Sequence, residues 1–245
     1  MELKIFKDYS DLSASAAMQI VNCVKSKPNA VLCFATGDTP KLAYQKVGEI
    51  AKQDNVDFTK CFFIGLDEWL GIPPANTGSC HYFLNHYLFA PLGIHNLQVR
   101  LFDAMTVNEE VECEKMNRLI EEKAGIDLML VGVGVNGHIG FNEPGADIGS
   151  GAHIAQLEEI TKSVGQKYFN EEVAINKGMT LGLKQVMNAR TLIMMANGKK
   201  KAPVVSRVLN ENISTDFPAS LLRQHNHSLL MVDEEAASEL EKQVV

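Results

Sequence analysis

Residues 131–145 have the sequence VGVGVNGHIGFNEPG and follow an apolar run that begins at Ile126. Glycines, a histidine, two asparagines and a glutamate are concentrated in this one short stretch. A buried strand that ends in glycines and then presents an imidazole and a carboxylate is typical of the active-site loops of α/β proteins. The glycines allow the backbone to approach a ligand closely. We therefore expect the rest of the chain to build a sheet that holds this loop.

The composition is that of an ordinary globular protein. The chain has 245 residues, 46% hydrophobic and 22% charged, which is enough to bury a full core. Its net charge of −7 disfavours a nucleic-acid partner, because nucleic-acid binding requires a basic face. No apolar run reaches the roughly 18 residues of a membrane span, so we expect no membrane association. The N-terminal MELKIFKDYS lacks the apolar core of a signal peptide, which favours a cytoplasmic protein.

The five cysteines form no CxxC pair. Cys33 and Cys61 lie in apolar runs, which predicts buried, reduced thiols. None of the five has a neighbour in the sequence that indicates catalysis.

Strands and helices are predicted to alternate along the chain. Short apolar runs predict strands at residues 3–6, 30–35, 61–66, 97–101, 126–133, 152–157, 177–183, 191–196 and 228–232. Periodic apolar positions predict helices at residues 11–25, 81–88 and 107–123, after Pro40, after residue 201 and after Asp233. Because these strands are apolar throughout, both faces of the sheet should be covered. We expect residues 1–245 to form one three-layer, Rossmann-like α/β domain, with a mostly parallel sheet and helices on both faces.

Four predicted strands end in polar or glycine-bearing loops, after Ala35, Leu66, Val133 and Ala196. Ligands of parallel sheets bind outside the carboxyl ends of the strands. These four loops should therefore meet around one site.

The loop after Ala35 is a candidate phosphate site. Its sequence TGDTP ends with Pro40 at the first helical position, and a helix N-terminus beside hydroxyl groups suits an anion. A plain strand-to-helix turn is the alternative, and a carboxylate at this point would repel phosphate unless it turned away. The lysines at residues 199–201 could supply a cation or form a solvated run. The candidate loop residues are Thr36, Gly37, Asp38 and Thr39.

Asp67 and Glu68 directly follow the strand at residues 61–66. Successive residues at a strand end point to opposite sides, so only one of the two carboxylates should face a cleft. That carboxylate is a candidate general base, and a helix cap or a surface charge is the alternative. Trp69, the only tryptophan, is expected in the core.

His138 has Asn136 two residues before it and Glu143 five residues after it. A glutamate bonded to a histidine fixes its tautomer and raises its basicity, whereas a lone histidine is more often structural. The chain has no HExxH and no GxSxG motif. We therefore expect neither a metal site nor a serine hydrolase.

Together these motifs resemble those of the glucosamine/galactosamine-6-phosphate deaminase (isomerase) family. TGDTP, LDEW, GVGVNGHIGFNEPG, GKKKA and DFPAS follow in the family's order over almost the whole chain. The resemblance implies aldose–ketose isomerisation with deamination of a hexosamine 6-phosphate, without a cofactor, in a possible homo-oligomer. Asp38, Trp69 and the HIAQLE segment favour galactosamine 6-phosphate, which would give tagatose 6-phosphate and ammonia. The alternative is glucosamine 6-phosphate, which would give fructose 6-phosphate and ammonia.

The resemblance also implies roles for single residues. Asp67 would move a proton from C2 to C1 of the sugar, and His138 would open the ring while Glu143 and Asn136 orient it. Many relatives have Asp in place of Asn136, and an asparagine can only orient. Lys167 in QKYF matches a phosphate-binding arginine of many relatives and could make only a single contact. The 6-phosphate would bind to Thr36, Gly37, Asp38, Thr39 and Lys201.

Two further functions are possible on this fold. A 6-phosphogluconolactonase would need no base at C2 and no ring opening, which the intact LDEW and NGHIGFNEPG motifs disfavour. A sugar-phosphate sensor of the repressor type would carry a helix-turn-helix ahead of the domain, whereas this chain begins with its first predicted strand. Residues 145–167, glycine-rich at their start, are predicted to form a lid.

Overall fold

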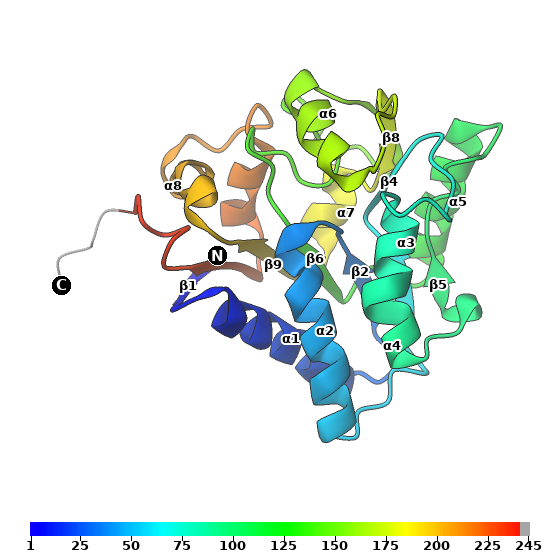
Figure 1. Ribbon diagram of the computed structural model, residues 1–245, viewed down its shortest axis with the longest axis horizontal. Coiled ribbons are helices and arrows are strands. Elements are labelled where there is room, and N and C mark those ends of the chain that lie inside the picture. The colour runs from blue at the N-terminus through cyan, green and yellow to red at the C-terminus, as the bar shows by residue number, and fades with distance from the viewer. Residues whose placement is uncertain (241–245) are drawn as a thin grey trace.

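The computed structural model describes residues 1–240 and has three layers (Figure 1). A seven-stranded sheet forms the middle layer, in the order β1-β10-β9-β6-β2-β3-β5, and all its strands are parallel. The predicted α/β fold is thus confirmed. The strands are β1 (Glu2–Phe6), β2 (Val31–Phe34), β3 (Phe62–Gly65), β5 (Val99–Arg100), β6 (Leu128–Val131), β9 (Thr191–Ala196) and β10 (Ser228–Asp233).

Helices cover both faces of this sheet. One face carries α1 (Tyr9–Ser26), α2 (Asp38–Gln53), α3 (Cys80–Leu84), the π-helical turn η1 (Asn85–Phe89) and α4 (Ala90–Leu92). The other carries α5 (Glu109–Glu122), α7 (Leu183–Asn188) and α8 (Ala202–Asn210). Neighbouring residues of β2 serve different cores, with Cys33 packed on the α5 side and Phe34 on the α1 side. This two-sided burial explains why the strands are apolar without alternation.

Short 3-10 helices occur in the connections. They are η2 (Asn96–Gln98), η3 (Gln166–Tyr168), η4 (Lys199–Lys201) and η5 (Pro218–Gln224), and α6 (Glu159–Gly165) directly precedes η3.

A second, antiparallel sheet has the order β4-β8-β7 and consists of β4 (Asp67–Trp69), β8 (Lys177–Thr180) and β7 (His153–Gln156). The sequence predicted strands near β7 and β8 but not that they leave the main sheet. Leu66 joins the two sheets, because its N–H donates to Phe34 and its C=O accepts from Leu181. Beside the small sheet, the rings of Trp69 and Phe141 pack with their centroids 4.6 Å apart.

Up to residue 240, where the described structure ends, the helix predicted after Asp233 is wrong, because residues 234–239 form turns and residue 240 a bend. The Asp233 carboxylate accepts from the Ala236 N–H, as a cap would, but it also accepts from the Gly198 N–H in the loop after β9. The side chain thus joins two loops. Among residues 1–240, no helix is long and apolar enough to cross a membrane.

Candidate active site

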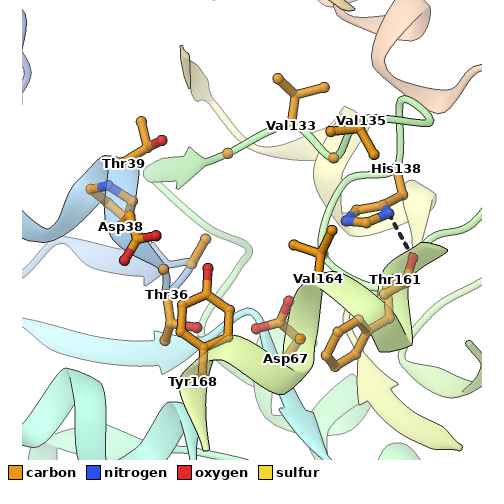
Figure 2. Close-up of a pocket in the computed structure, with 18 of the residues that line it drawn as sticks. Thr36, Asp38, Thr39, Asp67, Val133, Val135, His138, Thr161, Val164 and Tyr168 are labelled. Atoms are coloured by element: carbon orange, nitrogen blue, oxygen red, sulfur yellow. Dashed lines mark hydrogen bonds between the residues drawn. The ribbon is translucent and has the colours of Figure 1, made fainter. Parts of the chain in front are cut away.

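A cavity of about 430 Å³ opens at the carboxyl edge of the main sheet (Figure 2). Ala35, Asp67, Val133 and Asn197 line it, each at or just beyond the end of a different strand. The four loops therefore meet. Residues of α6 and η3 line the cavity as well.

Asp67 is the first residue of β4 and faces the cavity. The Cys80 thiol donates a hydrogen bond to Asp67 Oδ1 at 3.6 Å. Burial and the negative charge of Glu68 raise the pKa of Asp67 to about 7. A carboxylate that titrates near neutral pH is well matched to general base catalysis.

Glu68 points away from the cavity and is 2% exposed. Its carboxylate accepts from the backbone N–H groups of Trp69, Cys80 and His81 at 2.8–2.9 Å. Two of these donors belong to the first turn of α3. Glu68 therefore satisfies N–H groups at the start of α3, whose N-cap is Ser79, and the two neighbouring carboxylates have different tasks.

His138 lines the cavity, and its ring contacts Glu143 and Thr161. Nδ1 lies 3.3 Å from Glu143 Oε2 and 3.2 Å from the Thr161 hydroxyl. Asn136 Nδ2 donates to the same Glu143 oxygen at 2.9 Å. Burial alone would raise the pKa of Glu143, but the hydrogen bonds from His138, Thr161 and Asn136 outweigh it and lower the pKa to about 2. Glu143 is therefore an anion that orients the imidazole, with Nε2 as the nitrogen that can exchange a proton with a ligand.

Two glycines of the opening stretch make room for neighbouring rings, Gly134 for His138 and Gly137 for Phe217. A Cβ on Gly134 would lie 2.3 Å from His138 Cε1. Gly137 has φ of +87°, and a Cβ there would lie 2.2 Å from the Phe217 ring. Neither position accepts a larger residue without moving the loop.

All six predicted phosphate residues line the cavity: Thr36, Gly37, Asp38, Thr39, Lys167 and Lys201. Gly37, with φ of +107°, is the N-cap of α2 and offers no side chain to its first N–H groups. The Thr39 hydroxyl donates to Asn197 Oδ1 at 2.7 Å. Lys201 Nζ donates to the Val133 carbonyl at 2.6 Å, and burial lowers the pKa of this lysine. A helix N-terminus and a lysine thus share one end of the cavity, which suits an anion.

Asp38 is the residue least suited to a phosphate site, and it is paired. Its Oδ2 lies 2.7 Å from Lys167 Nζ. Burial would lower the pKa of Lys167, but its hydrogen bond to Asp38 outweighs this effect and raises it. The carboxylate therefore turns toward a cation, and the pair adds no net charge to the cavity.

Comparison with known proteins identifies the family of this chain. Residues 8–231 match the family described as glucosamine-6-phosphate isomerases/6-phosphogluconolactonase. The chain belongs to this family. A glucosamine-6-phosphate deaminase of Clostridium botulinum (strain Loch Maree / Type A3) is 35% identical over 241 residues, which cover 98% of this chain and 99% of the relative.

Solved structures agree with this membership. A monomeric glucosamine-6-phosphate deaminase is 32% identical, with a TM-score of 0.94 and coverage of 98% of this chain and 100% of that one. A 6-phosphogluconolactonase from Trypanosoma brucei is 20% identical, with a TM-score of 0.80 and coverage of 98% of both chains, and shares the fold. The family resemblance of the sequence motifs is confirmed, without distinction of a galactosamine branch.

Several side chains of this family member were not predicted from its sequence. Thr161 contacts His138 across 23 residues of chain, and Cys80 contacts both Asp67 and Thr36. These contacts depend on tertiary packing, and no sequence motif marks them. Lys200 lay within the lysine run and could have been proposed on that basis. The unpredicted lining residues include Cys80, Thr161, Tyr168, Asn197 and Lys200.

Residues 1–240 contain no group of three or more His, Cys, Asp and Glu side chains that could hold a metal ion. His225 and His227, the only HxH pair in the sequence, are not among the residues that line the cavity. His225 Nε2 instead contacts the Ala189 carbonyl at 2.8 Å, and burial lowers its pKa.

Proposed function

We propose that this protein converts glucosamine 6-phosphate and water into fructose 6-phosphate and ammonia. One observation carries the proposal: a carboxylate with a pKa of about 7, Asp67, shares a single cavity with the oriented imidazole of His138. Isomerisation of an amino sugar needs these two groups, a base for a C–H proton and an acid–base group for the ring oxygens.

The phosphate would bind first, at the end of the cavity formed by the N-terminus of α2 and Lys201. Free N–H groups and a partly buried ammonium group favour a dianion, beside the Thr36 and Thr39 hydroxyls, which in this structure donate to Cys80 and Asn197. An anchored phosphate holds C1 and C2 of the sugar in a fixed place, which removes orientational freedom before any bond changes.

His138 would then open the pyranose ring. Its imidazole takes the proton of the C1 hydroxyl and delivers a proton to the ring oxygen O5, so the C1–O5 bond breaks and an open-chain aldehyde forms. Glu143 stabilises the imidazolium that exists between the two transfers, because it accepts from Nδ1.

Asp67 would next remove the proton from C2 of the open-chain sugar and return it to C1. The electron pair of the C2–H bond forms a C1=C2 double bond while a proton passes from the C2 ammonium group to O1, which gives an enolamine. Return of the proton from Asp67 to C1 then leaves a protonated imine at C2. Water adds to this imine, the C2–N bond breaks, and ammonia leaves fructose 6-phosphate. The overall reaction consumes one water and needs no oxidant or reductant.

Glucosamine 6-phosphate is proposed as the substrate because of the names of similar proteins. The curated relative named above and the 32% identical solved structure both carry the name glucosamine-6-phosphate deaminase. The galactosamine preference expected from Asp38, Trp69 and the HIAQLE segment has no comparable support. The gluco epimer is therefore the proposed substrate, and the galacto epimer is its nearest competitor.

Ammonia release from each epimer under equal conditions tests the proposal. We expect the higher kcat/KM with glucosamine 6-phosphate, and almost none in Asp67→Asn. A higher value with galactosamine 6-phosphate would reverse the substrate assignment. Opening of 6-phosphogluconolactone above the background rate, or tight hexosamine phosphate binding without turnover, would instead identify a lactonase or a sensor.

A further inference from the structure

Three side chains from three separate segments form a line on one wall of the cavity. The Thr36 hydroxyl, in the loop after β2, donates to the sulfur of Cys80 at 3.2 Å. The Cys80 thiol, at the start of α3, donates in turn to Asp67 Oδ1 at 3.6 Å. Figure 2 shows Thr36 and Asp67, the two ends of this line, on the wall of the same cavity.

The backbone holds Cys80 firmly in this position. Its N–H donates to Glu68 Oε1 at 2.9 Å, and the residue is 4% exposed. Glu68 therefore fixes the start of α3, and the thiol next to the cavity moves only by rotation about one bond. A single rotatable bond confines the thiol to a few rotamers.

The thiol is suited to donating a hydrogen bond and not to nucleophilic attack. Burial and the charges of Glu68 and Asp67 raise the pKa of Cys80 well above its ordinary value. The sulfur therefore keeps its proton at every pH at which the carboxylate titrates. A protonated thiol beside Asp67 favours the ionised form of that carboxylate.

We propose that Cys80 is a positioning residue for Asp67: its thiol holds Oδ1, so that Oδ2 faces the substrate, and links the carboxylate to Thr36. The proposal rests on the function proposed above. It assigns no chemistry to the sulfur itself. The Thr36 hydroxyl polarises the sulfur and orients its proton toward the carboxylate, because donor and acceptor bonds in a chain strengthen one another.

The first test compares Cys80→Ala with Cys80→Ser. The alanine variant loses the donor, and we expect kcat to fall roughly tenfold, KM to change little and the acidic limb of kcat/KM to move to higher pH. The serine variant keeps a donor and should recover most of both effects. Cys113→Ala, which removes another buried thiol outside the cavity lining, controls for loss of a core side chain and should leave the rate unchanged.

A second readout does not depend on activity. Carbon-13 NMR of aspartate-labelled protein, with Asp67→Asn to identify the resonance, follows the Asp67 titration in each variant. We expect the titration of Asp67 to move to higher pH in Cys80→Ala and to return toward the wild-type position in Cys80→Ser. If the wild-type protein releases no ammonia, the proposed function fails, and the NMR titration still decides the contact.

A double-mutant cycle tests the link to Thr36. Thr36→Val should raise KM in either background, through the phosphate, but should lower kcat only when Cys80 is present. Equal kcat losses in both backgrounds would overturn the link. The positioning role would be overturned if Cys80→Ala kept the wild-type kcat and an unshifted Asp67 titration. It would also be overturned if Cys80→Ser were as impaired as Cys80→Ala.

Discussion

Lys167 Nζ lies 2.7 Å from Asp38 Oδ2, which ties the 3-10 turn η3 to the first residue of α2. Both side chains line the cavity and remain partly exposed, 48% for Lys167 and 72% for Asp38. The pair therefore holds a cation beside the proposed phosphate site. An exposed ion pair contributes little to stability, so its value lies in where it places the ammonium group.

Lys167→Met should therefore weaken substrate binding and leave folding intact. We expect KM to rise roughly tenfold with kcat little changed, because a charged contact to phosphate is lost. The free energy of unfolding should fall by no more than about 1 kcal/mol. Steady-state kinetics and urea denaturation measure the two effects, and Lys167→Arg should restore KM. An unchanged KM would remove Lys167 from the phosphate site.

Asp67→Asn should abolish the proton transfer while it preserves the shape of the site. We expect kcat to fall by about 10²–10⁴-fold, the range that general base catalysis contributes, with KM nearly unchanged. In the wild type, kcat/KM should fall as pH decreases through about 7, because burial and Glu68 raise the pKa of Asp67 to that value. A rate that stays constant between pH 8 and pH 5 would contradict this assignment.

The same substitution should stabilise the folded protein at alkaline pH. A carboxyl whose folded pKa lies above its ordinary value of 3.8 favours the protonated state on folding, so ionisation costs stability. The cost is absent below that ordinary pKa, grows as pH rises toward about 7 and is complete above it. Asp67→Asn should therefore raise Tm at pH 8 and leave it almost unchanged at pH 4, as calorimetry would show. An equal Tm change at both pH values would argue against a raised pKa.

Glu143→Gln should show the opposite dependence on pH. Its hydrogen bonds outweigh burial and lower the pKa of Glu143 to about 2, so the anion contributes stability above the ordinary pKa of 4.5. That contribution is lost as pH falls toward 2. We expect Glu143→Gln to be less stable than the wild type at pH 7. The difference in the free energy of unfolding should shrink when urea denaturation is repeated at successively lower pH. Its kcat should fall about 100-fold, because His138 loses the carboxylate that orients it.

Gly134→Ala should displace the His138 ring. The added Cβ would lie 2.3 Å from His138 Cε1, closer than any van der Waals contact allows. We expect kcat to fall at least about tenfold, since misplacement of a catalytic group by an ångström has that scale of effect. Gly48→Ala, inside α2, is the matched control. A Cβ at this position would contact only Pro91, at 4.0 Å. Full activity in Gly134→Ala would show that the loop relaxes.

Local sequence patterns predicted the main sheet well and the small sheet poorly. The strands β2 and β6 are buried and apolar throughout, and β9 is so after Thr191; such runs have few other stable environments. A run such as residues 177–183 looks the same whether it pairs in one sheet or another, because the choice depends on a distant partner. Residues 67–69 are too polar to suggest a strand, and they form one only because β8 offers backbone partners.

The helix predicted after Asp233 illustrates another limit. An aspartate before a polar, alanine-containing segment is a sound capping signal. The carboxylate here is shared with the Gly198 N–H, so a contact 35 residues away in the chain competes with the helix.

The candidate site divides in the same way. Asp67, His138 and the TGDTP loop follow strand ends, and the chemistry of their side chains was visible in the sequence. Strand alternation predicts that Asp67 and Glu68 point to opposite sides. It does not predict which side faces the cavity, so the roles of the two carboxylates could not be assigned from this pattern. Thr161 and Cys80 carry no signal of their own and reach the site through the packing of α6 and α3.

Leu66 has a backbone N–H bonded to Phe34 in the main sheet and a C=O bonded to Leu181 beside the small one. Its chain neighbour is Asp67, while Thr36 follows the end of the strand that holds Phe34. A tilt of the small sheet about this residue would swing the carboxylate relative to the phosphate loop without breaking either sheet. The distance between base and anchor can thus be retuned by substitutions in the packing between Trp69 and Phe141, two residues that also line the cavity.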